Sequence, residues 1–481
     1  MEYSLRVDTM VCKTGTITTI DGLNVTIDGV PTDTVWKEDD IEDVTTLAIA
    51  NYLMICGRPE LGDVEVGFNA HTEGDSNIAQ GRDSHAEGRL TSVYGQYGHS
   101  EGRNTIACYS GHAEGNAAKA LGDASHAEGN NTQAIGSNSH AEGVSSKARG
   151  EGAHVEGKTS HANGNYSHAE GISTQALGIS SHAEGEGSIA HAQNSHVEGA
   201  ANETTGTASH AEGWGSKANN IAAHAEGSSQ ANGKRSHAEG NGTKANGDNS
   251  HSEGLSTQAL NNNAHAEGEG SIAYEQNSHA EGAVTHAKGV ASHAEGWSSE
   301  ARGKISHAEG ERAIAEGATS HAEGNGTLAF GDYSHAEGVN SKAYGNRSHA
   351  EGNYCKTGKF DENGAYIVGT GNCAHAEGVA SYAGGEGAHA EGNQTIASGK
   401  AQHTEGAYNI EDINNKFIHI AGNGTAITDR SNAYTLDWNG NGWYQGNIEA
   451  SAIILRSSTP NSTKKFKITI TDDGTLSATE I

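Results

Sequence analysis

One short motif, His-x-Glu-Gly, occurs 24 times in the 481-residue chain, and its two ionisable side chains define the chemistry open to it. The motif histidines are 14 residues apart, except at two steps of 13 and one of 26. Imidazole and carboxylate groups act as acid–base catalysts, as metal ligands and as partners in charge-assisted hydrogen bonds. Catalysis, metal binding and structural pairing are therefore the three competing interpretations.

The regularity of the motif is evidence against catalysis and against metal binding. An enzyme places one unusual group of residues in one cleft, whereas this chain offers the same pair on every repeat. A metal site needs three or four converging ligands, and a uniform ladder offers every repeat equally. We therefore predict structural pairing, with no enzyme activity, no catalytic residue, no cofactor and no assigned metal ligand. Metal binding is the first alternative and catalysis the second.

The elements that carry the motif follow from one typical unit, residues 125–138, which divides into two halves of seven residues, each closed by glycine. Each half predicts a β-strand of about four or five residues and a tight turn at the glycine. Because side chains alternate across a strand, Ala127 faces opposite to His126 and Glu128, and Ala134 faces Ala127 across the coil. The unit is thus one two-stranded coil of a thin, all-β solenoid.

The motif histidines and glutamates share one face, which we call the His/Glu ladder. An alanine interior buries little apolar area, at ~25 cal/mol per Å², so further burial must come from the association of identical chains. We predict that the ladder lies at the contact between chains. Its representative residues are His126, Glu128, His140, Glu142, His182, Glu184, His210, Glu212, His251, Glu253, His293, Glu295, His335 and Glu337.

Protonation of the ladder would change the charge of the chain. The formal net charge is −31, and protonation of all 24 motif histidines would bring it to −7. If protonated histidine pairs with glutamate in the folded chain, the histidine pKa is raised and the glutamate pKa is lowered. The sequence therefore predicts a stability that responds to pH.

The composition excludes several partners. A net charge of −31 leaves no basic surface for nucleic acid. No stretch approaches the ~20 apolar residues of a membrane-spanning helix, and residues 1–15 lack the layout of a signal peptide. We expect no nucleic acid and no membrane insertion.

The five cysteines are too scattered for a disulfide framework; free thiols are expected, with a Cys355–Cys373 bridge as the alternative.

The repeat Ser-His-Ala-Glu-Gly-x-x-Thr-x-Ala-x-Gly-x-x, from about Val66 to Gly406, resembles the head repeat of YadA-type trimeric autotransporter adhesins. The resemblance implies a left-handed parallel β-roll, three chains around one axis, and histidine and glutamate directed toward the subunit contacts. We expect neither the export signal nor the C-terminal membrane anchor of those adhesins in this chain.

The C-terminal region is similar to a second class of protein. Residues 432–446, 458–470 and 472–476 resemble segments of tail-fibre or host-specificity proteins from phages and prophages of Firmicutes. The resemblance implies a homotrimeric receptor-binding protein located in the virion and soluble in the host cytoplasm before assembly. Its partners would be phage tail or baseplate proteins and a bacterial surface receptor, either a glycan or a protein. The alternatives are a bacterial trimeric adhesin that binds host matrix or glycans, and a polysaccharide-degrading tail spike.

Three domains are predicted. Residues 1–65 form an α+β attachment or capping domain, with strands at Thr16–Ile20 and Asn24–Ile27 and a helix at Ile41–Cys56. Residues 66–406 form the β-roll, interrupted by an insertion at 353–372. Residues 407–481 form a β-rich trimerisation or tip domain with two hairpins, whose strands are predicted at Tyr434–Trp438, Trp443–Ile448, Lys464–Thr471 and Thr475–Thr479.

Aromatic residues outside the coils are the candidates for contact with a receptor. The insertion carries two of them and the C-terminal domain three. For the insertion the preferred alternative is an ordinary surface loop, and for the C-terminal residues it is packing in the core of the trimer. The five candidates are Phe360, Tyr366, Trp438, Trp443 and Tyr444.

Overall fold

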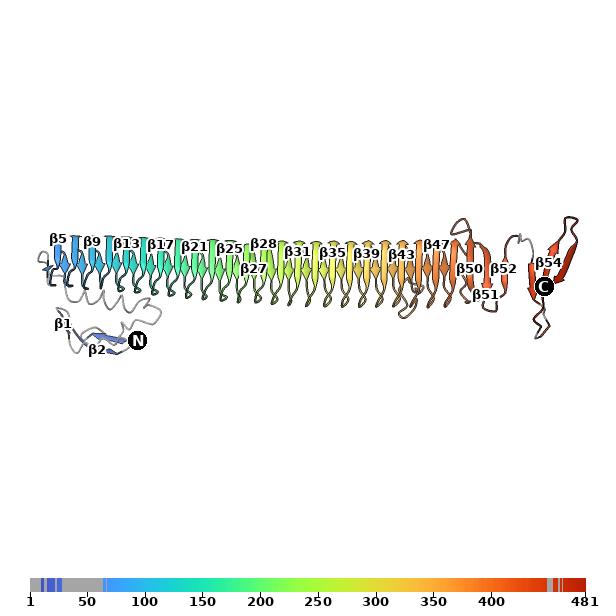
Figure 1. The fold of residues 1–481 in the computed structure, drawn as a ribbon, viewed down its shortest axis with the longest axis horizontal. Helices are drawn as coiled ribbons and strands as arrows, with labels where there is room; N and C mark the ends of the chain where they lie inside the picture. Colours follow the sequence, from blue (N-terminus) through green and yellow to red (C-terminus); the bar gives the residue numbers. More distant parts are fainter. Residues whose placement is uncertain are drawn as a thin grey trace. The chain divides into compact units, whose positions relative to one another are not determined.

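The computed structural model describes residues 67–447, 453–456, 459–460 and 462–481, together with four strands before residue 66. The elements of this described part are all β-strands (Figure 1). The chain divides into two compact units, Met1–Glu269 and Gly270–Ile481, and each is described by itself. In the described part of the chain, no helix has the length and apolar character needed to cross a membrane.

In unit 1, each motif histidine begins a long strand, and a two-residue short strand follows in most coils. The long strands are β5 (His71–Asp75), β7 (His85–Arg89), β9 (His99–Arg103), β11 (His112–Asn116), β13 (His126–Asn130), β15 (His140–Val144), β17 (His154–Lys158), β19 (His168–Ile172), β21 (His182–Glu186), β23 (His196–Ala200), β25 (His210–Trp214), β27 (His224–Ala231), β28 (His237–Ala245), β29 (His251–Leu255) and β31 (His265–Glu269). The short strands are β4 (Val64–Glu65), β6 (Ile78–Ala79), β8 (Ser92–Val93), β10 (Ile106–Ala107), β12 (Lys119–Ala120), β14 (Gln133–Ala134), β16 (Lys147–Ala148), β18 (His161–Ala162), β20 (Gln175–Ala176), β22 (Ile189–Ala190), β24 (Glu203–Thr204), β26 (Lys217–Ala218) and β30 (Gln258–Ala259).

Unit 2 repeats this arrangement. Its long strands are β33 (His279–Ala283), β35 (His293–Trp297), β37 (His307–Glu311), β39 (His321–Asn325), β41 (His335–Val339), β43 (His349–Asn353), β45 (His375–Val379), β47 (His389–Asn393) and β49 (His403–Ala407). Its short strands are β32 (Ile272–Ala273), β34 (His286–Ala287), β36 (Glu300–Ala301), β38 (Ile314–Ala315), β40 (Leu328–Ala329), β42 (Lys342–Ala343), β44 (Lys356–Thr357), β46 (Tyr382–Ala383) and β48 (Ile396–Ala397).

Within each unit, successive coils stack as parallel strands in register. In unit 1, β13 pairs with β15 so that His126 lies beside His140 and Glu128 beside Glu142. In unit 2, β39 and β41 pair in the same way. The short strands form a second parallel row, as β14 and β16 do. The all-β class and the parallel solenoid of 14-residue coils are confirmed.

The interior of each coil holds four small side chains. Ala127 and Ala134 are fully buried, as predicted. The sequence prediction missed Ser125 and Thr132, which are also buried. The Ser125 hydroxyl donates a hydrogen bond of 2.7 Å to the Gly122 oxygen, whereas the Thr132 hydroxyl forms no hydrogen bond with the described residues. The interior therefore mixes alanine with hydroxyl side chains.

The predicted strand lengths and turn positions need correction. The second strand has two residues rather than four or five. Gly129 lies inside β13, and the left-handed turn residues are Asn131 and Asn138, with φ of 60° and 58°. A Cβ at Gly136 would lie 1.9 Å from the Gly150 oxygen of the next coil. The close approach of stacked backbones therefore explains this glycine, and asparagine supplies the turn.

The ends of the chain contain antiparallel strands. In unit 1, the two predicted strands are confirmed as β2 (Gly15–Asp21) and β3 (Asn24–Ile27), which pair antiparallel, with β1 (Met10–Cys12) beside β2. The predicted helix at 41–56 lies outside the described residues. In unit 2, the first predicted hairpin is confirmed as β51 (Asn432–Asp437) and β52 (Gly442–Tyr444). The second is confirmed as β54 (Lys465–Ile470) and β55 (Leu476–Glu480), and β53 (Ile453–Arg456) pairs with β54.

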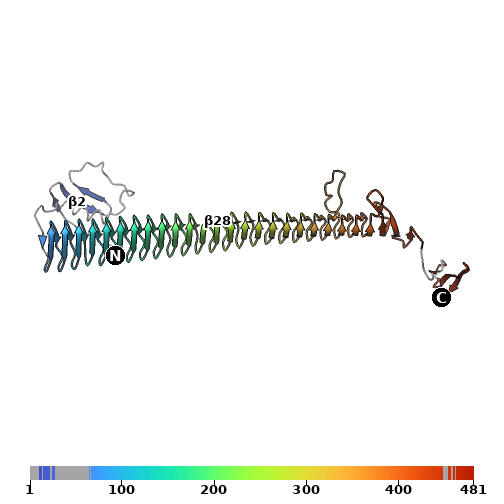
Figure 2. The same ribbon diagram turned by 90° about the horizontal axis from the view of Figure 1, so that it is seen from above.

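The insertion forms a small hairpin that projects from the coils of unit 2 (Figure 2). A single antiparallel bridge between Phe360 and Tyr366 closes it. Cys355 and Cys373, which flank it, are free thiols, the first buried and the second exposed. The expectation of free thiols is therefore confirmed for this pair.

Candidate functional site

The motif histidines of each unit stack into a column along one face. The rings of His126 and His140 have centroids 4.7 Å apart and are within 8° of parallel, and those of His321 and His335 are 4.8 Å apart and within 3°. The spacing equals the distance of about 4.8 Å between paired strands, because the histidine is the first residue of every long strand. In-register pairing thus turns one histidine per coil into a continuous column.

The motif glutamates form a second row beside the column. Within one coil, the distance from histidine Nε2 to glutamate Oε2 is 3.9 Å for His182–Glu184 and 3.4 Å for His251–Glu253. These distances exceed an N–H···O hydrogen bond. Of the other predicted ladder pairs, similar contacts join His210 to Glu212, His293 to Glu295 and His335 to Glu337. No contact within 4.0 Å joins His126 to Glu128 or His140 to Glu142 in the described chain.

The Nε2 atoms of the predicted ladder histidines are shielded from solvent and form no hydrogen bond with the described residues. This is unusual, since buried polar atoms in folded proteins are nearly always hydrogen-bonded. The predicted ladder histidines in this state are His126, His140, His182, His210, His251, His293 and His335. The structure thus brings the predicted ladder together and leaves one nitrogen of each of these rings without a hydrogen bond from the part of the chain that is described.

The prediction of raised histidine pKa values is wrong for this chain. Burial lowers the pKa of His140, and the stacked imidazoles of His126 and His154 lower it further, against the opposing effect of Glu128 and Glu156. A column of like groups disfavours protonation of any one of them. The same direction holds for His168, His182, His210, His224, His293, His321, His349 and His403.

The column continues beyond the last His-x-Glu-Gly motif. β50 (Phe417–Asn423) pairs in parallel with β49, and the ring of His419 lies 5.0 Å from that of His403. Tyr434 then contacts His419 edge-on at 5.6 Å, and Tyr444 lies 4.7 Å from Tyr434. The interpretation of His419 as outside the register is therefore wrong. A search for His-x-x-Gly would have found it, because Gly422 follows at the same spacing.

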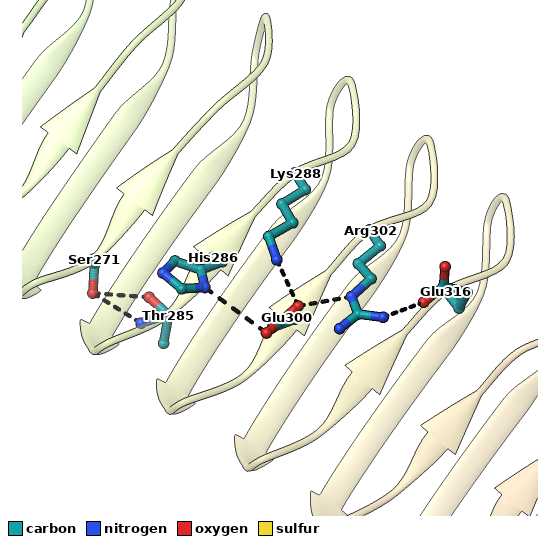
Figure 3. Close-up of polar contacts among 7 residues, drawn as sticks. All are labelled: Ser271, Thr285, His286, Lys288, Glu300, Arg302 and Glu316. Carbon is teal, nitrogen blue, oxygen red and sulfur yellow. Dashed lines mark hydrogen bonds and ion pairs between the residues drawn. The ribbon is translucent and has the colours of Figure 1, made fainter.

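The short-strand side of unit 2 carries a charged network (Figure 3). Glu300 Oε2 accepts hydrogen bonds of 2.7 Å from Lys288 Nζ and from Arg302 Nε, and Arg302 Nη1 donates one of 2.7 Å to Glu316. His286 Nδ1 lies 3.9 Å from Glu300 Oε1. Burial raises the pKa of Glu300, but the two hydrogen-bonded cations outweigh it and lower the pKa to about 2. The network links three successive coils.

The aromatic residues of the insertion pack onto the short-strand side of unit 2. The rings of Tyr344 and Tyr366 stack at 5.0 Å, and Phe360 meets Tyr344 edge-on at 5.0 Å. The Tyr366 hydroxyl donates a hydrogen bond of 2.8 Å to the Thr370 oxygen. Phe360 and Tyr366 are half-buried here, so both fasten the hairpin to the coils.

The three C-terminal candidates for receptor contact lie in different surroundings. Trp443 lines an open pocket of about 420 Å³. Adjacent residues of a strand face opposite sides, so its neighbour Tyr444 faces away from the pocket. The Tyr444 ring lies at the end of the histidine column, beside Tyr434. Trp438 Nε1 donates a hydrogen bond of 2.9 Å to the Asn415 oxygen. The pocket residues are Ile410, Lys416, Phe417, Ser431, Asn432, Thr435, Trp443 and Gln445.

Comparison with known protein families supports the repeat. Residues 113–139, 169–190 and 308–334 match the family described as "YadA head domain repeat (2 copies)". The matched stretches lie in both units and cover coils with the long and short strands described above. No curated protein matches the chain. The chain therefore contains YadA-like head repeats that form a β-solenoid, and this part of the predicted resemblance is confirmed.

Proposed function

We propose that this chain is a non-enzymatic subunit of a homotrimeric adhesive fibre whose copies associate through the His/Glu ladder. YadA head repeats are typical of trimeric autotransporter adhesins, and three stretches of this chain match that repeat. The observation that carries the proposal is the uniform ladder, where each coil presents half-exposed imidazole and carboxylate groups without hydrogen bonds between them.

The thin interior explains why several chains should associate. Each coil buries only small side chains such as Ala127 and Ala134, so burial inside one chain contributes little hydrophobic stabilisation. Identical ladders on three identical chains can face one threefold axis, which gives a closed symmetric assembly. Donors and acceptors of one copy can then meet those of another.

The proposal assigns no catalytic step to the ladder. Catalytic sites combine a nucleophile, a base and an orienting group in one cleft. Here the same pair of side chains recurs on coil after coil along an open face. A repeating surface of this kind suits association and adhesion, which need many equivalent contacts.

The pocket around Trp443 is the proposed point of contact with a receptor. Pockets that combine aromatic side chains with a few polar groups are typical of small-ligand sites. Trp443 and Phe417 supply ring faces, and Asn432, Thr435 and Gln445 supply amide and hydroxyl groups. This combination suits a saccharide of a cell surface. Phe360, Tyr366 and Trp438 are proposed for packing instead, because each has a partner within the chain.

The match to YadA head repeats favours a bacterial surface adhesin that binds host matrix or glycans. A second candidate is the receptor-binding fibre of a phage, with tail or baseplate proteins and a bacterial surface receptor as partners and the virion as its location. It rests on the resemblance of residues 432–446, 458–470 and 472–476 to phage tail-fibre proteins. Immunodetection in purified phage particles and in washed cell envelopes of the producing strain would separate the two.

The mass of the full-length protein in solution tests the trimer. Sedimentation equilibrium should give three times the chain mass of 49.6 kDa. Charge-reversing substitutions Glu128→Lys and Glu142→Lys should reduce the trimer, whereas Lys400→Glu at an exposed pair away from the ladder should not. A monomeric wild-type chain would contradict the fibre.

A further inference from the structure

We propose that the His/Glu ladder binds divalent transition-metal ions such as Zn²⁺, Ni²⁺ or Cu²⁺, each held by two successive histidines and the glutamate between them. All three ligands of one ion come from one chain. The inference therefore goes beyond the adhesive role and does not depend on the trimer.

Two groups in unit 2 show the arrangement most directly. Glu351 Oε2 lies 3.8 Å from Nε2 of His349 in the same strand and 3.9 Å from Nε2 of His375 in the next coil. Glu391 Oε2 likewise lies 3.7 Å from His389 Nε2 and 4.0 Å from Nε2 of His403. One carboxylate oxygen is thus placed between two imidazole nitrogens that belong to stacked coils.

Unit 1 contains the same arrangement. The ligand atoms of each group lie within 4.8 Å of one another. From the sequence alone, each coil supplies one histidine and one glutamate, which are too few ligands for a metal site. In-register stacking supplies the missing third ligand from the next coil. Two such groups in unit 1 are His85, Glu87 and His99, and His224, Glu226 and His237.

The distances fit an ion better than a direct hydrogen bond. A hydrogen bond would bring nitrogen and oxygen to about 2.9 Å, whereas a tetrahedral ion with bonds of about 2.0–2.2 Å separates its ligand atoms by about 3.4 Å. The histidine–glutamate distances of 3.7–4.0 Å in the two unit 2 groups need only a small contraction to reach that value, whereas the two histidine rings, 4.8 Å apart in the first group, must bring their nitrogens closer by a larger movement.

Coordination by both histidines requires the rings to tilt toward each other. The rings of His349 and His375 are parallel within 2° at 4.8 Å, so their nitrogen lone pairs do not converge as they stand. The column accommodates such tilts elsewhere, because His196 and His210 differ by 33° and His237 and His251 by 40° at the same spacing. The stack therefore has the rotational freedom that ion binding needs.

The histidine ligand atoms have no competing hydrogen bond from the described residues, and the tilt that turns the rings toward the ion must also expose their shielded Nε2 atoms. Nε2 of His349, His375, His389 and His403 forms no hydrogen bond with the described residues. The Glu351 side chain is 46% exposed, so an ion can approach the carboxylate from solvent. Water would complete the coordination, as it does in sites with three protein ligands.

The ligand set defines the class of ion. Imidazole with carboxylate suits Zn²⁺, Ni²⁺ and Cu²⁺, whereas Mg²⁺ and Ca²⁺ prefer all-oxygen surroundings. The net charge of −31 also attracts cations to the chain. Excess Mg²⁺ should therefore leave the binding of Zn²⁺ nearly unchanged.

The test uses full-length protein treated with EDTA and then dialysed. Calorimetric titration with Zn²⁺ should give several ions per chain, and Co²⁺ should produce the visible absorption bands of a nitrogen–oxygen site. His321→Gln, His335→Gln and His349→Gln together should remove about two ions per chain, since each ion uses two histidines. The matched control is His161→Gln, His191→Gln and His286→Gln, which changes three histidines outside the column and should leave the number unchanged.

Two results would overturn the inference: uptake of less than one Zn²⁺ per chain by the wild type, or an equal loss in the control variant. If the ladder variant does not fold, wild-type protein answers the question through diethylpyrocarbonate modification. Zn²⁺ should protect ladder histidines more than His161, His191 and His286, and equal protection would contradict the proposal. Sedimentation with and without EDTA separates the metal-site hypothesis from the trimer hypothesis. A trimer that binds no ions would refute only the metal site. A monomer that binds ions would refute only the fibre.

Discussion

The imidazole rings of His126 and His140 lie 4.7 Å apart and within 8° of parallel, so two ionisable rings stack directly on each other. This stacking sets the electrostatics of the whole face. Two protonated rings at such a distance repel each other, and the half-exposed glutamates beside them offset that repulsion only in part. The folded column therefore favours neutral histidine.

The first prediction is that acid destabilises the protein. Burial and neighbouring imidazoles lower the pKa of His140 and His321 below the ordinary 6.5 of the unfolded chain. Between that value and the lower folded pKa, the unfolded chain binds more protons, so the free energy of unfolding falls as pH falls below about 6.5. The histidine contribution is fully present above that pH. Thermal unfolding followed by circular dichroism in EDTA at pH 8 to 5 should show a falling Tm, and a rise on acidification would contradict it.

The second prediction concerns the network around Glu300. Glu300→Gln removes the negative charge that Lys288 and Arg302 share and weakens their hydrogen bonds, so we expect the free energy of unfolding to fall by about 1 kcal/mol. The matched control is Glu386→Gln, since its pair with Lys400 is largely exposed and should contribute little. Urea unfolding of the three proteins measures the difference. Equal midpoints for both variants would show that the network does not stabilise the coils.

The 14-residue period predicted the coils, and the alternation of side chains around Ala127 predicted the interior and the ladder. Both features depend only on residues that are close in sequence within one repeat. The Glu300 network could not be predicted in the same way. The equivalent short-strand position is Gln133 in one coil and Lys147 in the next, so the partners depend on which residues happen to be stacked. The pocket at Trp443 depends on antiparallel strands outside the repeat, whose packing no period describes.

The third prediction separates two roles of glycine. Gly136→Ala would place a Cβ 1.9 Å from the Gly150 oxygen, so two coils must separate, and we expect a loss of about 3 kcal/mol or more. Gly215→Ala is the control, since a Cβ there meets nothing within 4 Å and the cost is the left-handed φ of 71°, about 1 kcal/mol. Urea unfolding should rank wild type above Gly215→Ala and Gly215→Ala above Gly136→Ala. If Gly136→Ala were the more stable of the two variants, the close approach of stacked coils would not be the reason for the glycine at position 136.

The fourth prediction uses the opposite directions of two adjacent residues. Trp443 lines the pocket, whereas the Tyr444 ring packs against that of Tyr434 at 4.7 Å, at the end of the histidine column. If the pocket binds a saccharide, Trp443→Ala should reduce retention on a glycan array by about tenfold or more, because aromatic anchors dominate the energy of such contacts. Tyr444→Ala should leave retention within about twofold and instead weaken association of the chains, measured by sedimentation. Both variants should keep the circular dichroism spectrum of the wild type, since both side chains are half-exposed. A loss of glycan retention in Tyr444→Ala alone would move the receptor contact from the pocket to the ladder side of β52.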